Sequence, residues 1–308
     1  MPWDLACPSC HAALTHVGTD EQDCPACAVS YRRQDGIWYL LARGRQESVR
    51  EFVDRYETVR TAEGRRVQDP DHLRALPFRD LSQKRPYEWH IRSQSYKALI
   101  RYVIQPLERR HRGQLRILDL GSGLGWLAYR LSLRGHLVGA IDLVTNDFDG
   151  LGVHRHYDSE FISLQADFDR LPFPERSVDL LVYNAAFHYA ADYLATLEEA
   201  LRILAKDGRV AIMDSPLYRD PASGAAMVRE REDAFERRCG IRRSTVPSEA
   251  FLSYDRLATL GVDLALRWEL FEPWYGARWR LRPWAARIRG SREPAQFKLV
   301  VGHRLGES

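Results

Sequence analysis

The sequence predicts an α/β protein in which a mostly parallel sheet follows a small metal-stabilised module. From residue 113 onward, short apolar runs alternate with stretches of helical spacing, which is typical of βαβ units. Four of the five cysteines fall within residues 1–41, in two CPxC turns. The 308 residues are about twice the length of a typical domain, so we expect one large and one smaller domain.

Composition narrows the possible classes of protein. Apolar residues make up 45% and charged residues 28% of the chain, as in ordinary globular proteins. No run approaches ~18 apolar residues, and the start, MPWDLACPSC, lacks the pattern of a secretory leader. We therefore expect no transmembrane segment and a cytoplasmic location. The net charge of +3 does not by itself indicate a polyanionic partner.

The two CPxC turns are separated by 13 residues, which is the spacing of a zinc ribbon. Four thiolates complete a tetrahedron and leave no position for water, so the expected zinc is structural. Two disulfides, or cysteines without a common role, are the alternative interpretation. The fifth cysteine, Cys239, is expected to be a small apolar filler. The expected metal ligands are Cys7, Cys10, Cys24 and Cys27.

Residues 42–112 form a helical, strongly charged segment with a net charge of +7. Apolar residues at helical spacing predict helices over 47–62 and around 96–107. We expect this segment to link the cysteine module to the α/β domain and to cap that domain.

The third part, 113–308, is expected to be the α/β domain. Helices are predicted over 125–134 and 190–205. Strands are predicted at 115–120, 136–142, 161–166, 178–184 and 208–214, with two more near 262–271 and 296–303.

A glycine-rich turn follows the first of these strands. In Asp119-Leu-Gly121-Ser122-Gly123 a buried strand leads into glycines that let the backbone approach a ligand, and a helix N-terminus follows. Such a turn can bind many different nucleotide ligands, or it can simply reverse the direction of the chain. Asp142 ends the next strand, where a carboxylate can accept both hydroxyls of a ribose.

Further residues after the third strand sharpen this interpretation. Asp167-Phe168 is followed by Leu-Pro-Phe at 171–173. With these motifs, residues 113–214 resemble the class I S-adenosylmethionine-dependent methyltransferases of the type 11 group. The resemblance implies a seven-stranded Rossmann-like methyltransferase sheet, mostly parallel, with an antiparallel last hairpin. Binding of a dinucleotide is less favoured, because the wider GxGxxG spacing is absent.

The resemblance also implies a site for S-adenosylmethionine at the carboxyl ends of the first four strands. For each aspartate, a helix cap or turn is the alternative role. The resemblance implies that Asp119, Gly121, Ser122 and Gly123 contact the methionine part of the cofactor and that Asp142 holds the ribose. It implies that Asp167 and the Phe168 backbone contact the edge of the adenine, and that Asn184 borders the sulfonium.

His188 is the candidate catalytic residue. It lies just beyond the fourth strand, in the crevice where open α/β sheets bind ligands. The resemblance favours a base or a group that orients the acceptor, whereas packing and capping of the next helix is the alternative. The chain lacks Asn-Pro-Pro-Tyr after this strand and a cysteine nucleophile, which disfavours methylation of adenine N6 or pyrimidine carbon 5.

Two insertions interrupt the end of the domain. Residues 215–261 are long enough for a lid helix at 223–238 over the acceptor site. Residues 272–294 hold three tryptophans and six arginines with a net charge of +4. This segment suits stacked bases, a membrane surface or an anionic substrate, and packing against the rest of the chain is the alternative.

These features predict a methyltransferase, EC 2.1.1.-, that acts on an oxygen or nitrogen of a small or lipid-like molecule. A ribosomal-RNA methyltransferase of the guanine-N1 type is the first alternative, because such enzymes also carry a zinc module. The module here has a net charge of −3, which disfavours contact with RNA phosphates. A non-catalytic, cofactor-binding scaffold is the second alternative. The oligomeric state is not predicted.

Overall fold

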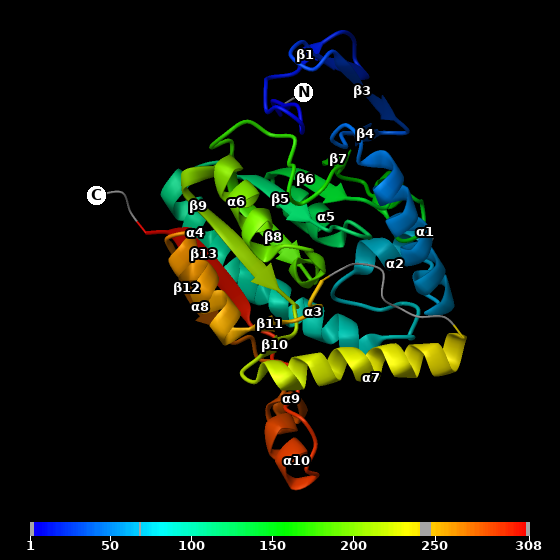
Figure 1. Ribbon diagram of the computed structural model, residues 1–308, viewed down its shortest axis with the longest axis vertical. Helices are drawn as coiled ribbons and strands as arrows, with labels where there is room; N and C mark the ends of the chain where they lie inside the picture. The colour runs from blue at the N-terminus through cyan, green and yellow to red at the C-terminus, as the bar shows by residue number, and fades with distance from the viewer. Residues whose placement is uncertain (1–2, 68, 241–247, 306–308) are drawn as a thin grey trace.

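A single sheet of eleven strands runs through the computed structural model, which describes residues 3–67, 69–240 and 248–305 (Figure 1). In spatial order the strands are β1 (Thr15–His16), β2 (Glu21–Cys24), β3 (Val29–Gln34), β4 (Ile37–Tyr39), β7 (Ile162–Gln165), β6 (Leu137–Asp142), β5 (Arg116–Leu120), β8 (Val178–Asn184), β9 (Leu204–Met213), β13 (Leu299–Arg304) and β12 (Leu266–Phe271).

The eleven strands correct the expectation of a seven-stranded sheet beside a separate N-terminal module. Strand β4 pairs in parallel with β7, with Trp38 opposite Leu164. The antiparallel meander of β1 to β4 therefore continues the α/β sheet. Without the module, β7 would be an edge strand with unpaired backbone N–H and C=O groups. Strand β4 of the N-terminal module supplies the hydrogen-bond partners for these groups.

Residues 116–304 contribute the other seven strands of this mixed sheet. Strands β7, β6, β5, β8 and β9 are parallel, and β13 is antiparallel to both β9 and β12. Every residue of β8 is buried, as in a strand covered on both faces. The carboxyl ends of the five parallel strands meet at one edge, which positions the loops that follow them.

The helices lie around this sheet, and a two-stranded parallel pair, β10 (Leu217–Tyr218) and β11 (Leu252–Ser253), lies apart from it. None of the described helices is both long and apolar enough to cross a bilayer. The helices are α1 (Gln46–Ala62), α2 (Pro70–Ala75), α3 (Pro86–Leu99), the π-helical η1 (Ile100–Ile104), α4 (Gln105–His111), α5 (Trp126–Ser132), the 3-10 helices η2 (Leu151–His156) and η3 (Phe187–Tyr189), α6 (Tyr193–Ile203), α7 (Pro221–Cys239), α8 (Tyr254–Asp263), α9 (Ala277–Arg280) and α10 (Arg282–Ile288).

Several element boundaries differ from the sequence prediction by a few residues, and three of the differences have a clear cause. The helix expected around 96–107 is part of one helical stretch through α3, η1 and α4. Strand β9 starts at Leu204 instead of 208, because Leu204 pairs with Val178 before an irregularity in the register. Residues 262–263 belong to α8, so β12 is shorter than the run that predicted it.

Alternate residues of the central strands enter two hydrophobic cores, one on each face of the sheet. Leu181 and Tyr183 of β8 belong to one core, and Leu180 and Val182 to the other. Side chains of α6 and α8 fill the first core, and side chains of α3 and α5 fill the second. Buried residues of the N-terminal module, including Trp38, belong to the first core, so the module shares its interior with the α/β domain.

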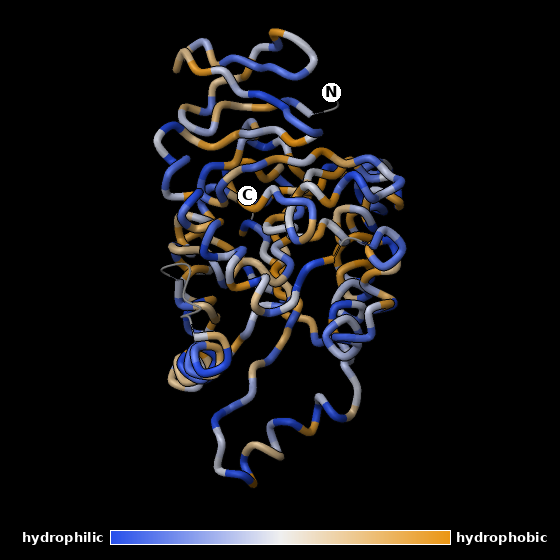
Figure 2. Tube along the Cα trace, turned by 90° about the vertical axis from the view of Figure 1, so that its right-hand side faces the viewer, coloured by the Kyte–Doolittle hydropathy of each residue, from blue (hydrophilic) through white to orange (hydrophobic). Residues whose placement is uncertain are grey.

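Helices α9 and α10 form an arm that projects from the end of the molecule opposite the N-terminal module (Figure 1). The arm mixes hydrophobic and hydrophilic residues along its length (Figure 2). Trp279 packs near Phe297, with ring centroids 5.1 Å apart, whereas Trp274 and Trp284 are exposed. Packing against the cysteine module or 42–112 therefore does not account for these two tryptophans.

Candidate functional site

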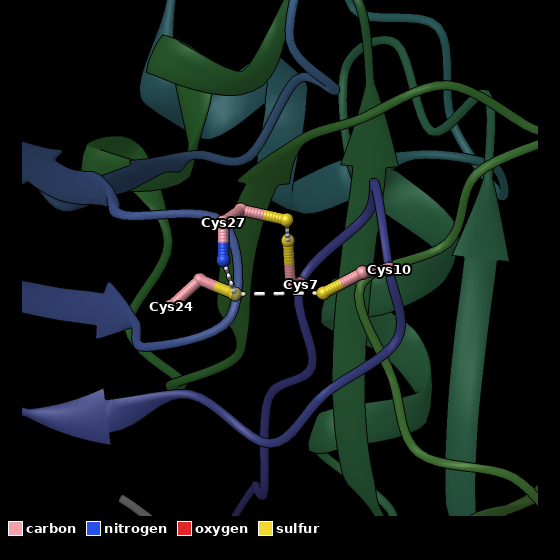
Figure 3. A group of neighbouring side chains, drawn as sticks. All are labelled: Cys7, Cys10, Cys24 and Cys27. Atoms are coloured by element: carbon pink, nitrogen blue, oxygen red, sulfur yellow. Dashed lines mark hydrogen bonds between the residues drawn. The ribbon is translucent and has the colours of Figure 1, made fainter.

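The four cysteines of the N-terminal module converge on one point (Figure 3). Their sulfur atoms all lie within 4.8 Å of one another, and the closest pairs are 3.5 and 3.9 Å apart. All are free thiols, and these separations far exceed a disulfide bond of about 2.05 Å. Four sulfurs at about 2.3 Å from one tetrahedral ion would lie roughly 3.8 Å apart. The cluster therefore fits one zinc ion.

The glycine-rich turn lies between β5 and α5, pressed against the end of β8. Gly121, Gly123 and Gly125 all have positive φ, at +71°, +50° and +66°. A Cβ on Gly121 would lie 2.4 Å from the Cβ of Ala186, so a side chain does not fit there. Gly123 has open space in front of it, with only the Asp149 carbonyl within 4 Å. The turn therefore presents bare backbone toward the carboxyl edge of the sheet.

Asp119 ends β5 beneath this turn and is fully buried. Its Oδ2 accepts a 3.2 Å hydrogen bond from the Ala128 N–H in the first turn of α5, while its Oδ1 has no partner among the described residues. Burial, with a smaller contribution from Asp142, raises the pKa of Asp119 to about 7. One oxygen thus caps a helix, and the other is available to a donor or a cation.

Asp142 ties two loops together. Its Oδ2 accepts from the Gly123 N–H at 2.8 Å, and its Oδ1 accepts from the Val144 N–H at 3.0 Å. Burial raises the pKa of this carboxyl to about 6. A carboxylate has about four lone-pair sites, so these two bonds leave acceptor capacity for a ligand hydroxyl. The expected ribose contact and the alternative turn role are therefore compatible.

Several buried polar atoms at the carboxyl edge of the sheet have no partner in the part of the chain that the structure describes. These are Asp119 Oδ1, Ser122 Oγ, Asn184 Oδ1 and Asp214 Oδ2. A buried polar atom without a hydrogen bond costs about 1–3 kcal/mol, and more when charged, so such a set marks a place for a polar ligand. Three of the four are oxygens of carboxylates or an amide, and these suit a ligand that carries a cationic group, such as an ammonium or a sulfonium.

Asp214 is a site residue that the sequence analysis did not single out. It follows β9 with φ of +55°, and its Oδ1 accepts a hydrogen bond from Ser95 Oγ on α3. The same Ser95 oxygen lies 2.9 Å from the Tyr275 hydroxyl. Burial raises the pKa of Asp214, although Arg92 lies near enough to lower it. The available signal was its position, because Asp214 ends the fifth predicted strand, 208–214, as Asp142 ends the second.

The carboxylate of Asp167 has a partner that the sequence did not predict. Arg45, just before α1, holds it with two hydrogen bonds, Nε to Oδ2 at 2.9 Å and Nη2 to Oδ1 at 3.2 Å. Phe168 stands edge-on to Tyr183, with ring centroids 5.5 Å apart. Its ring would be 3.1 Å from a Cβ on Gly121. Both residues therefore lie beside the turn, with Asp167 facing α1.

Helix α1 makes a second, similar contact with the rim of the site. Arg60 forms a bidentate ion pair with Asp149, whose side chain is almost fully buried. The Asp149 carbonyl is the atom nearest to the open face of Gly123. Tyr56, one turn earlier, lies near enough to Asp149 and Asp142 for these charges to raise its pKa, after the larger effect of burial. Helix α1 therefore covers the loops at this edge.

His188 is buried in η3, directly after β8. Its Nδ1 lies 3.1 Å from Ser215 Oγ, and its ring packs against Tyr189 with centroids 4.3 Å apart. The alternative role of capping α6 belongs to Asp192, whose side chain accepts from the N–H groups of Leu194 and Ala195. His188 and Ser215 thus connect the loops after β8 and β9.

Comparison with known proteins supports the same region. Residues 118–212 match the model of a methyltransferase domain. Demethylmenaquinone methyltransferase of Thermus thermophilus is 36% identical over 116 residues, which cover 36% of this chain and 50% of that protein. Malonyl-[acyl-carrier protein] O-methyltransferase of Erwinia pyrifoliae is 31% identical over 96 residues, which cover 31% of this chain and 36% of that protein.

A solved geranyl diphosphate methyltransferase superposes with a TM-score of 0.53 at 15% sequence identity. The match covers 84% of this chain and 100% of that structure, which shows a shared fold. This chain spans half or less of the length of the two curated relatives. Residues 118–212 therefore match a methyltransferase domain, and the chain as a whole shares the α/β fold of that solved methyltransferase.

Proposed function

We propose that the protein is an S-adenosylmethionine-dependent methyltransferase, EC 2.1.1.-, that methylates an oxygen or nitrogen of a small or lipid-like molecule. The observation that carries this proposal is the set of buried, unpartnered oxygens of Asp119, Ser122 and Asn184 around a bare glycine turn. These oxygens can accept hydrogen bonds from an ammonium group or face the positive charge of a sulfonium. The names of the relatives, which refer to demethylmenaquinone, a malonyl-[acyl-carrier protein] and geranyl diphosphate, support a small or lipid-like acceptor.

The proposed contacts with the cofactor follow the order along the edge of the sheet. Asp119 with Gly121, Ser122 and Gly123 holds the methionine part, Asp142 the ribose, and Asn184 borders the sulfonium. Asp167 and the Phe168 backbone face the adenine, with Arg45 closing this end of the site by its bond to Asp167. When bound, the cofactor supplies a methyl group already activated on sulfur.

The chain itself aligns the acceptor and excludes water. Transfer of that methyl group would be an in-line displacement, so the residues of the site would have to hold a lone pair of the acceptor opposite the carbon–sulfur bond that breaks. Reacting atoms need to be held at about 3–3.5 Å. His188, oriented by Ser215, is the proposed base that takes the acceptor proton, or the group that orients the acceptor.

We also propose a three-part organisation for the whole chain. Residues 1–41 form a zinc ribbon in which Cys7, Cys10, Cys24 and Cys27 hold a structural ion. Residues 42–112 cap the catalytic domain, and 113–308 form that domain with lid insertions at 215–261 and 272–294. Part of the first insertion, 241–247, lies outside the described residues. The proposed location is cytoplasmic.

Incubation of the protein with methyl-labelled S-adenosylmethionine and a deproteinised extract of its source tests the proposal. We expect label in the organic-soluble small-molecule fraction. Label in the RNA fraction would instead favour the ribosomal-RNA alternative, and no transfer into either fraction would contradict the activity. The same incubation with the Asp142→Ala variant, at a cofactor concentration near the wild-type dissociation constant, should give several-fold less label in the small-molecule fraction.

Asp142→Ala is expected to weaken binding of S-adenosylmethionine by about tenfold or more, because a charge-assisted hydrogen bond and the anchor of Gly123 are both lost. Calorimetric titration measures this affinity. Asp147→Ala, in the same loop but exposed, is the matched control and should bind normally. Equal affinity in Asp142→Ala and the wild type would remove Asp142 from the site.

His188→Ala is expected to slow methyl transfer while leaving cofactor affinity within about twofold. Steady-state kinetics with the acceptor found above, together with a titration of the cofactor, separate the two effects. A variant with an unchanged rate would restrict His188 to packing between the loops that follow β8 and β9.

A further inference from the structure

A cavity of about 190 Å³ opens between the end of α1, α2 and the start of α3. Its wall holds five basic side chains, which are Arg60, Arg65, Arg66, Lys84 and Arg85. We call this cavity the basic pocket. Sites that bury a whole drug-sized ligand measure roughly 300–1,000 Å³, so the basic pocket fits a charged group and leaves the rest of a larger molecule outside.

The basic pocket shares a wall with the proposed methyltransferase site. Leu124, in the glycine-rich turn, and Asp149 both line it. The Asp149 carbonyl is also the nearest atom to the open face of Gly123. On the other side, Trp89 of α3 lines the pocket, and the same helix continues to Ser95, which donates to Asp214 at the end of β9. A ligand held in the pocket therefore lies next to the site without replacing the cofactor contacts.

Two of the five cations already have carboxylate partners. Arg60 is paired with Asp149. Arg65 bonds to Glu63 at 2.9 Å and to both carboxylate oxygens of Glu88 at 3.0 and 3.2 Å. These two arginines are held in place as walls of the pocket, and their charges are compensated.

The other three cations, Arg66, Lys84 and Arg85, form no ion pair with any described carboxylate. Arg85 donates to the backbone carbonyl of Glu63 at 2.7 Å, and burial, followed by the charge of Arg65, lowers its pKa. The guanidinium of Arg66 lies 4.5 Å from the centroid of the Phe148 ring. A lowered pKa means that the cationic form is disfavoured in the present surroundings, so an added anion would stabilise Arg85.

The remaining acidic residue of the wall does not offset these charges. Asp69 caps α2 by accepting from the Asp71 N–H, so its charge is directed at a helix N-terminus. Glu88 and Glu63 lie near enough to Arg85 to offset part of its charge, but neither forms an ion pair with it. Guanidinium groups bind phosphate with two parallel hydrogen bonds, and three cations without an ion pair exceed what one ligand carboxylate requires.

We propose that the basic pocket binds a phosphate or diphosphate group of the methyl acceptor. This inference rests on the proposed function and specifies its substrate class. The anionic group sits among Arg66, Lys84 and Arg85, and the atom to be methylated extends past Leu124 toward the carboxyl edge of the sheet.

Calorimetric titration of the full chain with inorganic pyrophosphate at constant ionic strength tests the pocket. We expect Arg85→Gln, and separately the double variant Arg66→Gln/Lys84→Gln, to weaken pyrophosphate binding at least tenfold, as loss of charged hydrogen bonds does. Affinity for S-adenosylmethionine should stay within twofold in both. Arg101→Gln, an exposed arginine on η1, removes the same charge elsewhere and should change neither affinity.

Each contrary result identifies what failed. If the wild type does not bind pyrophosphate, the pocket does not serve the acceptor. If the variants lose affinity for S-adenosylmethionine instead, the pocket holds the carboxylate of the cofactor and again does not serve the acceptor. Decyl phosphate should bind more tightly than inorganic phosphate, and equal affinities would assign the pocket to the free ion. Pyrophosphate binding without any cofactor binding would overturn the proposed function while leaving an anion site.

The projecting arm supports a second inference, which is independent of the first. Four large apolar side chains of the arm are mostly exposed, at 61%, 58%, 64% and 65% for Trp274, Leu281, Trp284 and Ile288. At 100° per residue, Leu281, Trp284 and Ile288 fall within about 60° of one another around the helical stretch. They therefore form one apolar face on a segment that stands away from the body (Figure 1).

Arginines flank this apolar face on both sides. Arg280 and Arg287 lie on one side of it and Arg289 on the other, at about 80–120° from Leu281. The two glutamates of the segment lie at its ends and are engaged, Glu272 with Lys298 and Glu293 with backbone N–H groups near α7. An apolar stripe bordered by cations is the pattern of a helix that lies in an anionic membrane surface.

We infer that the arm docks on the surface of an anionic lipid bilayer. Aliphatic Leu281 and Ile288 favour the acyl boundary over nucleic acid, since they offer no ring for stacking on a base. Cosedimentation with vesicles tests this, using phosphatidylcholine alone and a 7:3 mixture with phosphatidylglycerol. We expect the full chain to sediment with the mixture, and Trp284→Ala/Ile288→Ala to lose at least tenfold in binding.

Val262→Ala, which removes an exposed apolar side chain elsewhere, should sediment like the wild type. Arg287→Gln/Arg289→Gln should lose the preference for the anionic mixture. The inference fails if the wild type stays in the supernatant with both vesicles. It also fails if Trp284→Ala/Ile288→Ala converts a dimer to a monomer in sedimentation velocity, because the arm would then bind a second copy of the chain.

Discussion

Three aspartates at the carboxyl edge of the sheet, which we propose to face the cofactor, are each held by hydrogen bonds within the chain. Asp119 caps α5, Asp142 joins the turn at Gly123 to the loop at Val144, and Asp167 is held by Arg45. Each carboxylate is thereby kept in a defined orientation before any ligand arrives. Such pre-organisation lowers the cost of ordering the site on binding.

The raised pKa of Asp119 predicts a specific dependence of stability on pH. The unfolded chain releases this proton near pH 3.8 and the folded chain near 7, so the folded state binds more protons between these values. Stability therefore falls as pH rises through this window. Relative to the wild type, Asp119→Asn should gain stability progressively from pH 4 to 7, by up to about 4 kcal/mol.

Urea unfolding at pH 4.5, 6 and 7.5 measures this difference between Asp119→Asn and the wild type. Asp147→Asn changes an exposed carboxylate in a nearby loop and serves as the control. A stability difference that stays constant over the three pH values would show that Asp119 titrates as in the unfolded chain.

Among the elements, α1 connects the N-terminal module to the loops at the carboxyl edge of the sheet. Arg45 at its start and Arg60 in its last turn each hold an aspartate from a loop of the α/β domain. The two ion pairs differ in surroundings, because Arg45 is more exposed than Arg60, and Asp149 is almost fully buried. The end of α1 is therefore held more firmly than its beginning, since the pair at Arg45 is better screened by solvent.

Arg60→Gln is expected to destabilise the fold by about 3 kcal/mol, because it leaves the Asp149 carboxylate buried without a counter-charge. Chemical denaturation measures the change. Arg55→Gln, on an exposed position of the same helix, should have little effect. Adding Asp149→Asn to Arg60→Gln should recover much of the loss, and no recovery would mean that packing of the Arg60 side chain, not charge, held the helix.

At the scale of the whole molecule, the N-terminal module completes the sheet. Its strand β4 covers the edge strand β7, and the Ala6 N–H donates to the Pro172 carbonyl at 3.0 Å. Trp3 meets Phe173 edge-on, with ring centroids 5.2 Å apart. The four thiols therefore hold together a structure on which the α/β domain depends for one edge.

Elemental analysis is expected to find one zinc ion per chain. Removal of zinc by a strong chelator, or Cys10→Ser, should loosen the module, because its strands pair around the four thiols. Hydrogen exchange at the β7 amides should then accelerate and the protein should aggregate through the uncovered edge. Cys239→Ser should retain the metal. A metal-free protein with unchanged exchange at β7 would contradict this role of the cluster.

Local patterns in the chain were enough to place the α/β strands, the glycine-rich turn and the two CPxC turns. Apolar runs, helical spacing and ligand spacing act over a few residues, so they leave a mark that can be read along the chain. The α/β class predicted from these patterns, and the methyltransferase fold that the family resemblance implied, are supported by the fold match and the domain match. The contacts assigned to individual site residues stay predictions.

Only the folded chain shows how distant segments meet. The bonds of Arg45 to Asp167, Arg60 to Asp149 and Ser95 to Asp214 join residues 122, 89 and 119 positions apart. The pairing of β4 with β7 made eleven strands out of an expected seven. An exposed strand edge or an unpaired carboxylate can pair with any suitable group, and the local sequence does not indicate which group that is. These contacts were therefore decided by how the segments pack around the sheet.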